Sequence, residues 1–249
     1  MIVLTLIFSA SPCLRGEILP LISVVIPALN EVECLPRLVD TLQEIGSIAE
    51  IIVADGGSAD GTREWVLGRQ GITLIDSPRG KGPQLNAGAA RATGDVLLFL
   101  HADCQMNSNA WQALESAMAG PQIAGGAFHI SFAEKAPSSL QLVEKGINAR
   151  TTITRTATGD QGIFVRRSTF TGFAGAPDWP LFEDVELVRR IKKAGRFAVI
   201  KAPLTISGRR YIQNGVIQTA LLIFALRLAF WLGVSPYRLK AWFNEVRKT

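Results

Sequence analysis

The sequence predicts an α/β protein with a mixed, mostly parallel sheet flanked by helices. Two observations carry this prediction: apolar, β-branched runs alternate with helical segments, and three runs end on carboxylates, in EIIVADGG, DVLLFLHAD and WPLFEDVEL. Strands that alternate with helices of about ten residues form right-handed βαβ units. With 249 residues, 48% of them hydrophobic, one large domain is favoured over two small ones.

The individual elements follow from residue type and period. Leu35, Leu38, Leu42 and Ile45 recur on one helical face, with Pro36 in the first turn. Strands are expected at residues 21–26, 50–54, 72–75, 95–100, 125–132, 159–166 (opened by a polar loop) and 197–202. Helices are expected at residues 33–45, 60–69, 83–92, 109–119, 138–154 and 184–194, the last closed by Gly195.

No repeat or low-complexity linker divides the chain. We therefore expect one domain over residues 21–210, an N-terminal extension over residues 1–20 and a hydrophobic, basic helical tail over residues 211–249. The extension is apolar for only about eight residues and lacks a basic start, so it is a poor signal peptide. Three cysteines without pairing or metal spacing favour a reducing cytoplasm.

Positive charge gathers towards the C-terminus. From Leu187 onward Glu245 is the only acid in the sequence. The same stretch holds thirteen basic residues: Arg189, Arg190, Lys192, Lys193, Arg196, Lys201, Arg209, Arg210, Arg227, Arg238, Lys240, Arg247 and Lys248. Such asymmetry implies an anionic neighbour, either phosphates or a membrane surface. No nucleic-acid partner is expected, because no nucleic-acid motif accompanies the charge.

The loop after the first strand argues against two common nucleotide-binding motifs. No GxGxxG follows this strand and no GxxxxGK[ST] occurs in the chain, so Rossmann and P-loop chemistry lose their main support. The segment PALNE stands there instead, in which Pro27 is expected to stop the strand. Asn30 and Glu31 also have a simpler interpretation, as caps of the next helix.

The second acid-tipped run continues as DGGSADGT. Its glycines let the backbone approach a flat ligand closely, and Asp55 is suited to accept from the imide N–H of a base. A turn followed by a helix cap explains Asp60 without a ligand but leaves Asp55 unexplained.

In order and spacing, several segments resemble the family-2 glycosyltransferases of GT-A fold: PALNE, DGGSADGT, GKG with NAG, ATGD and LFLHAD. The resemblance covers residues 21–210. The segments GDQGIFVRR, FEDVEL and SGRRY, with the hydrophobic tail, look most like one bacterial subgroup, the radical-SAM/selenodomain-associated transferases. That name records a genomic association and identifies no substrate.

The resemblance implies roles on the donor side. Pro27, Asn30 and Glu31 would border the nucleotide, and Asp55 would bind its base. Lys81 would lie near the ribose or the diphosphate.

The resemblance also implies a divalent metal, Mg²⁺ or Mn²⁺. Asp103 matches the last carboxylate of the family's Asp-x-Asp motif, which holds the metal against the donor diphosphate. His101 stands at the first position, so this chain departs from the motif. One carboxylate can still anchor the ion together with phosphates and waters, and a histidine ligand would favour Mn²⁺. A strand-end histidine without metal contact is the alternative for His101.

Glu183 and Asp184 begin a helix, whose N-terminus favours an ionised carboxylate. The resemblance makes Asp184 the base that deprotonates the acceptor hydroxyl, with Glu183 beside it on the acceptor side. With no second nucleophilic carboxylate expected, the reaction would be a single inverting displacement. The alternative is that both acids only stabilise the helix terminus.

Two further segments match family positions near substrate. Gly159, Asp160 and Gln161 match a loop on the acceptor side. Arg209 and Arg210 follow the last strand, where the family often places a group that touches the diphosphate. Arginine suits that role because its planar fork is bidentate, although a solvated surface or lipid headgroup contact explains both residues as well.

The tail contains a hydrophobic segment at residues 216–234, which is near the length of a membrane span. Gln218 and Arg227 interrupt it, and a central arginine costs about 2.5–3.5 kcal/mol in a bilayer. Trp231 and Tyr237 with flanking basic residues favour an interfacial helix. The alternatives are packing on the catalytic domain or on a partner subunit, and a helix that spans the bilayer.

Together these observations predict a metal-assisted, inverting glycosyltransferase that uses a UDP- or GDP-linked sugar and an acceptor hydroxyl. The acceptor is expected to be lipid-linked or amphiphilic, and the protein to lie on the inner face of the plasma membrane. Two alternatives stay open. A nucleotidyltransferase of related fold would carry a Gly-rich signature where this chain has PALNE. A non-catalytic nucleotide-sugar binder would explain the absent first Asp of the metal motif.

Overall fold

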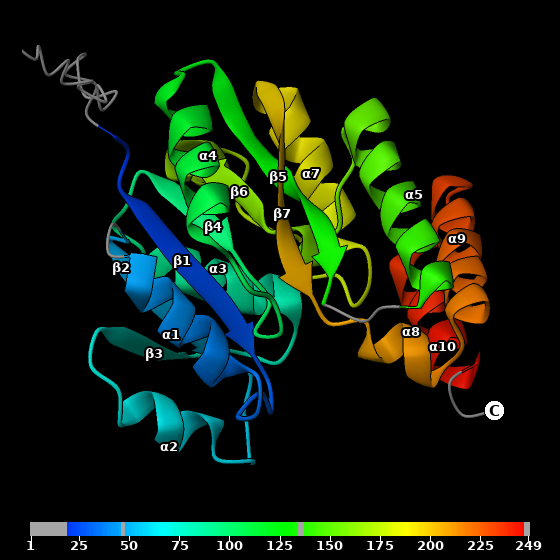
Figure 1. Ribbon diagram of the computed structural model, residues 1–249, viewed down its shortest axis with the longest axis horizontal. Coiled ribbons are helices and arrows are strands. Elements are labelled where there is room, and N and C mark those ends of the chain that lie inside the picture. Colours follow the sequence, from blue (N-terminus) through cyan, green and yellow to red (C-terminus); the bar gives the residue numbers. More distant parts are fainter. Residues whose placement is uncertain (1–18, 46–47, 134–136, 247–249) are drawn as a thin grey trace, which may run out of the picture.

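The computed structural model describes residues 19–45, 48–133 and 137–246 and contains a seven-stranded sheet flanked by helices (Figure 1). The strand order is β3-β2-β1-β4-β6-β5-β7. The strands are β1 Ile22–Ala28, β2 Glu50–Asp55, β3 Ile72–Asp76, β4 Val96–Phe99, β5 Ile123–Phe132, β6 Ile163–Arg166 and β7 Arg196–Ile206. Most of the expected N-terminal extension lies outside the described residues.

The main helices alternate with these strands, as expected for βαβ units. They are α1 Leu35–Ile45, α2 Thr62–Leu67, α3 Lys81–Arg91, α4 Ser108–Ala119, α5 Ser138–Thr154, α6 Arg167–Gly172 and α7 Glu183–Ala194. A 3₁₀ turn, η1 Gly159–Gln161, precedes β6, and the chain continues through α8 Arg209–Gln213, α9 Val216–Trp231 and α10 Pro236–Val246.

Pairing within the sheet confirms the predicted mixed, mostly parallel sheet. Strands β1, β2, β3 and β4 run parallel to one another, and β5 runs parallel to β7. Only β6 is antiparallel to its two neighbours, β4 and β5. The carboxyl ends of β1, β2 and β4 therefore meet at one edge of the sheet, where open α/β sheets bind ligands.

Both faces of the sheet are buried because side chains alternate along each strand. On β1, Ile22, Val24 and Ile26 face a core shared with α1 and α4, whereas Val25 faces a second core. The second core contains residues of α3, α6 and α7. This arrangement explains why the central strands are continuous apolar runs rather than alternating ones.

The prediction that Pro27 ends the first strand is wrong. β1 continues to Ala28, with Pro27 in register with Ala54 of β2. The last bond between β1 and the chain of β4 runs from the Leu100 amide to the Val25 carbonyl, at 3.1 Å. Because backbone groups of alternate residues point to opposite sides, Pro27 faces the side where β4 has already ended. Its missing N–H therefore leaves no partner unsatisfied.

Several predicted boundaries shift for physical reasons. The last strand was expected at residues 197–202 but runs to Ile206, because its parallel pairing with β5 continues to Phe132. Helix α3 starts at Lys81, two residues before the expected start, after Gly80 with a φ of 137°. The short helix α6 was not predicted.

The tail folds as α8, α9 and α10 and packs on the domain. Leu226 and Leu239 form a small apolar cluster with Phe182, directly before α7. Helices α5 and α9 lie side by side at the end of the sheet beyond β5 and β7 (Figure 1). Among the described residues, no helix combines the length and the apolar character that crossing a bilayer requires.

Candidate active site

The loops after β1 and β2 are joined by hydrogen bonds. Asn30, with a φ of 57°, accepts from the Ala59 amide through Oδ1 at 2.9 Å. Its own amide donates to Ser58 Oγ, also at 2.9 Å. The Asn30 side chain therefore connects the two loops and does not cap α1. The Glu31 carbonyl accepts from the Leu35 amide at the start of that helix.

Asp55 lies at the tip of β2 with its carboxylate buried. Its oxygens accept from the amides of Gly57 and Ser58, from the Ser58 hydroxyl and from Nη1 of Arg63. Burial alone would raise the pKa of Asp55, but the hydrogen bonds from Ser58 and Arg63 hold it below its usual value. The carboxylate is therefore ionised and fixed in place before any ligand arrives.

Glu31 and Asp103 come from different strand ends and lie close enough to influence each other. Burial raises the pKa of Glu31, and the negative charges of Asp103 and Asp60 raise it further. Asp103 itself is exposed in the turn after β4. The carboxyl edge of the sheet thus carries a concentrated negative charge, which a cation would relieve.

A small cavity brings together residues that are far apart in sequence. Its lining includes Pro27, Lys81, His101, Gly159 and Asp184. Lys81 Nζ lies 3.2 Å from His101 Nε2. A Cβ on Gly159 would lie 2.8 Å from the same nitrogen, so only glycine allows the loop to approach this closely. The cavity holds about 10 Å³, so a substrate must lie across its mouth or move side chains.

Asp184 and Glu183 stand at the N-terminus of α7 in different surroundings. Asp184 Oδ2 accepts from the Gly159 amide at 2.7 Å and Oδ1 from the Val185 amide at 2.7 Å. Glu183 is buried beside it and also lines the cavity. Burial and the adjacent Asp184 raise the pKa of Glu183 to about 7. Phe182, with a φ of 64°, produces the sharp turn that presents both acids.

The 159–161 turn is held from inside the fold. Gln161 is fully buried, and its Nε2 donates to the Phe128 carbonyl at 3.1 Å. Its Oε1 accepts from Arg150 Nη2 of α5 at 2.9 Å. Asp160 accepts from the Thr158 hydroxyl. Gln161 therefore supports the loop, whereas Gly159 is the member that lines the cavity.

The two arginines after β7 lie at the periphery of this edge. Arg209 Nη1 is 4.0 Å from Glu33 Oε2 on the surface, and both side chains are exposed. Arg209 also opposes the rise in the pKa of Cys34, which burial and then Glu31 cause. The side chain of Arg210 lies outside the described part of the structure.

Comparison with known proteins identifies the family. A model described as "Glycosyl transferase family 2" matches residues 23–179, which is more than half of the chain. The chain belongs to glycosyl transferase family 2. The match covers nearly all of β1, the strands β2 to β6 and the 159–161 turn, and it ends before Glu183 and Asp184. Membership of the bacterial subgroup stays a prediction.

Two curated relatives show how far the similarity extends. The PGL/p-HBAD biosynthesis glycosyltransferase of Mycobacterium bovis is 37% identical over 92 residues, 34% of this chain and 36% of that protein. The glucosyl-3-phosphoglycerate synthase of Mycolicibacterium smegmatis is 36% identical over 92 residues, 33% of this chain and 30% of that protein. The matched segment spans about a third of the length of these relatives.

Solved structures confirm the GT-A fold. Glucosyl-3-phosphoglycerate synthase from Mycobacterium tuberculosis, in complex with Mn²⁺, UDP and glucosyl-3-phosphoglycerate, superposes with a TM-score of 0.59 at 20% identity. It covers 84% of this chain and 79% of that one. The mannosyltransferase PcManGT from Pyrobaculum calidifontis, in complex with GDP-Man and Mn²⁺, gives 0.56 at 21% identity, covering 74% and 55%. At these identities the likeness shows the fold alone.

The side chains at the carboxyl edge provide one carboxylate ligand for the divalent metal that this family implies. Among the described residues, no group of three or more His, Cys, Asp or Glu side chains could hold an ion. Exposed Asp103 can bind a cation whose other ligands are phosphates and waters. His101 can ligate through Nε2 only if Lys81 moves away, because the ammonium contacts that nitrogen.

Four residues of this site were not predicted. Gln84 of α3 is buried and donates to the carbonyls of Ala28 and Ala54, which ties the ends of β1 and β2 together. The other three are arginines: Arg63, Arg150 and Arg227. Arg227 has a visible signal, a charge inside an apolar helix, but the sequence predicts only an interruption of that helix and a share in the basic C-terminal stretch. Arg63 and Arg150 lie in ordinary polar helix positions, so no sequence pattern separates them from surface arginines.

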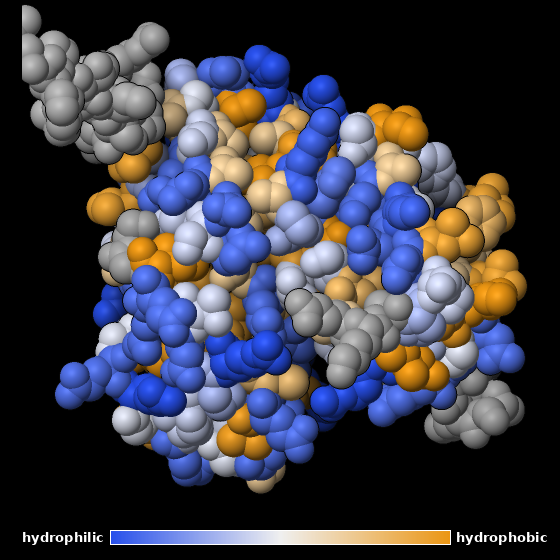
Figure 2. Space-filling view, in the orientation of Figure 1, coloured by the Kyte–Doolittle hydropathy of each residue, from blue (hydrophilic) through white to orange (hydrophobic). Residues whose placement is uncertain are grey.

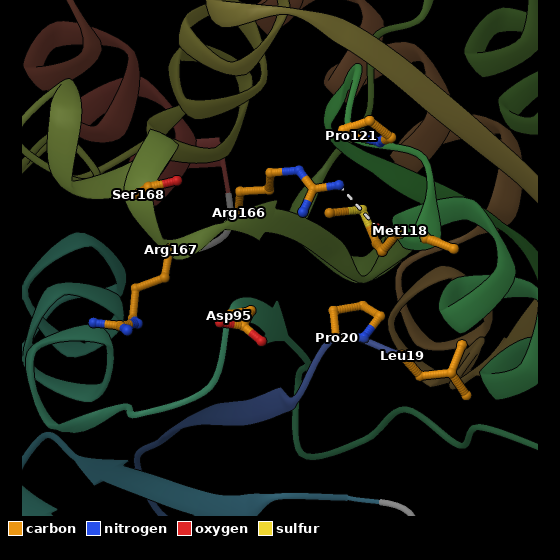
Figure 3. A pocket seen from close by; sticks show the side chains of 9 residues that line it. Leu19, Pro20, Asp95, Met118, Pro121, Arg166, Arg167 and Ser168 are labelled. Carbon is orange, nitrogen blue, oxygen red and sulfur yellow. Dashed lines mark hydrogen bonds between the residues drawn. The ribbon is translucent and has the colours of Figure 1, made fainter. Parts of the chain in front are cut away.

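A second, larger cavity lies at the opposite edge of the sheet (Figure 3). Arg166 extends across it, but its guanidinium already donates to the carbonyls of Met118, Gly120 and Ile123. Arg167 Nε donates to the Gly94 carbonyl. Arg166 therefore ties the end of α4 to the start of β5, and Arg167 binds the chain just before β4.

Proposed function

We propose that this protein is an inverting glycosyltransferase that moves a sugar from a nucleotide-diphosphate sugar to an acceptor hydroxyl. The observation that carries the proposal is the cavity at the carboxyl edge. It combines a cation, Lys81, with an ionisable pair, Glu183 and Asp184, across a glycine turn at Gly159. A cation beside a base is what transfer from a diphosphate leaving group to a hydroxyl requires.

The donor occupies the side formed by β1, β2 and α3. Pro27, Asn30 and Glu31 border the nucleotide. Asp55 contacts the base, which requires the loop at Gly57 and Ser58 to open because the carboxylate is buried. Lys81, which is close to the cavity mouth, lies against the diphosphate and stabilises the charge that develops on it. Arg209 and Arg210 assist at the periphery, where their forks suit phosphate oxygens.

Asp184 is the general base. The amides of Gly159 and Val185 hold its two oxygens and keep the carboxylate aimed at the acceptor hydroxyl. Removal of the proton as the hydroxyl attacks the anomeric carbon contributes about 10²–10⁴-fold to the rate. Because no nucleophilic carboxylate is required on the other face of the sugar, one displacement inverts the anomeric centre.

Asp103 is the protein ligand of a divalent cation, Mg²⁺ or Mn²⁺. When bound, the cation would supply neutralisation of the negative charge on the donor diphosphate. Asp103 would hold the cation from the exposed turn after β4. His101 in this account positions Lys81 through their 3.2 Å contact and becomes a ligand only after that contact opens.

The acceptor lies against η1 and α7. Gly159 permits close approach, Gln161 fixes the loop from inside, and Asp160 and Glu183 border the acceptor. We propose that acceptors reach this side from a cytoplasmic membrane surface. The support is a row of exposed apolar residues on one face of α9, called the apolar stripe below: Ile217, Leu221, Phe224, Leu228 and Trp231.

A thermal-shift panel tests the donor assignment. UDP-, GDP- and dTDP-sugars are added to the full chain with and without Mn²⁺, since a ligand that binds only the folded state raises the unfolding midpoint. The proposal expects one nucleotide class to raise it, with a larger rise when Mn²⁺ is present, and Asp103→Ala to remove the effect of Mn²⁺. No response to any nucleotide sugar would contradict it.

Two alternatives have distinct outcomes in the same preparation. Release of pyrophosphate from a sugar phosphate and a nucleoside triphosphate would instead identify a nucleotidyltransferase. Donor binding that EDTA does not change, with no turnover of the donor, would identify a non-catalytic nucleotide-sugar binder.

A further inference from the structure

Two arginines point into the junction between α5, α9 and the acceptor-side turn. Arg150 belongs to α5 and Arg227 to α9, helices that pack against each other (Figure 1). Arg150 Nε and Arg227 Nη1 are both buried and have no hydrogen-bond partner. A buried guanidinium nitrogen without a partner is costly, so each of these groups requires an explanation.

The neighbouring acids do not provide the missing bonds. Asp160 and Asp184 act electrostatically on both arginines. However, Asp184 accepts from the amides of Gly159 and Val185, and Asp160 accepts from the Thr158 hydroxyl. The two acids therefore lie within range of the arginines but direct their hydrogen bonds elsewhere.

The two arginines also repel each other. Burial and then the charge of Arg227 lower the pKa of Arg150 to about 10, so Arg150 remains charged at neutral pH. Burial likewise lowers the pKa of Arg227. The junction therefore holds two guanidinium groups that repel each other and that each have an N–H group without an acceptor. An anion between them would accept hydrogen bonds from both and would reduce the repulsion.

Helix α9 is fixed to the catalytic turn, so the junction belongs to the acceptor side. Phe230 of α9 contacts Phe182, with ring centroids 4.9 Å apart, directly before Glu183 and Asp184. Arg150 donates to Gln161 of the turn at 2.9 Å. Both arginines are thus connected to the segments that carry the proposed base and its support.

We propose that Arg150 and Arg227 bind an anionic group of the acceptor, a phosphate or a carboxylate, and so place a nearby hydroxyl at Asp184. This inference rests on the proposed glycosyltransferase function. It narrows the acceptor to a hydroxyl compound that carries an anion, whose source is either a small soluble molecule or a lipid headgroup. Guanidinium groups suit this role because each can donate two parallel hydrogen bonds to one oxyanion.

The test measures the thermal unfolding midpoint of the full chain in the presence of different anions. The probes are inorganic phosphate, glycerol 3-phosphate and, as the neutral match, glycerol. The inference expects the first two to raise the midpoint and glycerol to have no effect at equal concentration. Arg227→Met should weaken the response to glycerol 3-phosphate at least about tenfold, whereas Arg238→Met, the same change at an exposed position of α10, should leave it intact.

The unfolding midpoint of Arg227→Met without added anion shows whether Arg227 binds a ligand or only supports the fold. Removing an unpaired buried charge should leave the anion-free midpoint of Arg227→Met equal to or above that of the wild type. A lower midpoint together with an unchanged response to glycerol 3-phosphate would overturn the inference. So would a wild-type protein that responds to neither anion.

Binding to lipid vesicles shows whether the anion belongs to a lipid headgroup or to a soluble molecule. Binding to phosphatidylglycerol vesicles that Arg227→Met weakens and glycerol 3-phosphate displaces supports the inference with a lipid headgroup as the source. A response to glycerol 3-phosphate alone supports it with a soluble acceptor. The effect of UDP is measured in the same samples, so failure of the donor proposal is seen separately from failure of the anion site.

Discussion

At the scale of single residues, the first turn of α7 holds three carboxyl groups with contrasting environments. Burial and Asp184 raise the pKa of Glu183 to about 7, whereas hydrogen bonds from Arg189, with help from Arg190, lower that of Glu186. Asp184 between them faces the cavity and is held by backbone amides. One turn of helix thus contains a carboxyl group with a raised pKa, a carboxylate held by backbone amides and a structural ion pair.

This contrast predicts different pH dependences of stability for two matched variants. Glu183 takes up a proton on folding between about pH 4.5 and pH 7, so its contribution to stability is complete below that window and lost as pH rises through it. Glu183→Gln should therefore gain stability relative to wild type from pH 5 to pH 8, by about 1–3 kcal/mol. Glu186→Gln should be less stable than wild type by a constant amount over the same range, because the lowered pKa of Glu186 changes stability only as pH falls below about 4.5. Urea unfolding at several pH values measures both, and parallel profiles would contradict the assignment.

At this scale the motif residues were predictable and their supports were not. Lys81, Gly159 and Asp184 were expected near substrate, and the structure brings them to one cavity. Arg63 and Arg150 could not be found, because their roles depend on side-chain contacts with Asp55 and Gln161, which lie 8 and 11 residues away in the chain. Sequence pattern reveals a residue at a strand tip, but it does not reveal which residue of a nearby helix turns its side chain towards it.

At the scale of elements, α3 is positioned by glycines rather than by large apolar side chains. A Cβ on Gly88 would collide with the side chain of Val25 in the core, and one on Gly82 would collide with the Pro177 carbonyl. Helix α3 therefore lies unusually close to β1 and to the loop before α7. This close packing brings Lys81 to the cavity.

Alanine substitutions should separate packing from helix propensity. Gly88→Ala should destabilise the protein by about 1–3 kcal/mol, because Val25 is stiff and fully buried and cannot yield. Gly146→Ala in α5 has no atom within 4 Å of the new Cβ and should stabilise by up to about 1 kcal/mol. Chemical denaturation of both variants is the measurement. Equal effects would show that α3 does not pack as described.

Whether a segment forms a helix or a strand was predictable from the period of its apolar residues, but the length of a strand depended on the neighbouring strand that pairs with it. The helices α1 and α7 follow their apolar spacing closely. Strand β7 is longer than its local pattern because β5 pairs with it to the end. A strand's extent is thus set by the neighbour that pairs with it, which a single sequence does not show.

At the scale of the whole molecule, apolar surface and basic charge share one end. The apolar stripe of α9 is exposed, and hydrophobic residues gather over α9 at the right-hand edge in Figure 2. Exposed Arg238 follows in α10. A helix of this kind can lie in a headgroup layer, and its inner side meanwhile packs on Phe182 beside the proposed base.

Membrane attachment through this stripe makes a measurable prediction. Phe224→Ser combined with Trp231→Ser should weaken sedimentation with anionic vesicles at least about tenfold, since two exposed anchors lose their apolar contact. Leu67→Ser, at an equally exposed position on α2, should have no effect. Wild-type protein that stays in the supernatant, or a double variant that binds as well as wild type, would contradict this attachment.

The most direct test of the central claim is donor turnover by wild type and Asp184→Asn. Asparagine keeps an oxygen for the Gly159 amide, so the fold and nucleotide binding should persist while the base is lost. The account predicts release of nucleoside diphosphate from the matching nucleotide sugar by wild type, and about 10²–10⁴-fold slower release by Asp184→Asn at an unchanged midpoint shift with UDP or GDP. Release at the wild-type rate by Asp184→Asn would contradict the claim.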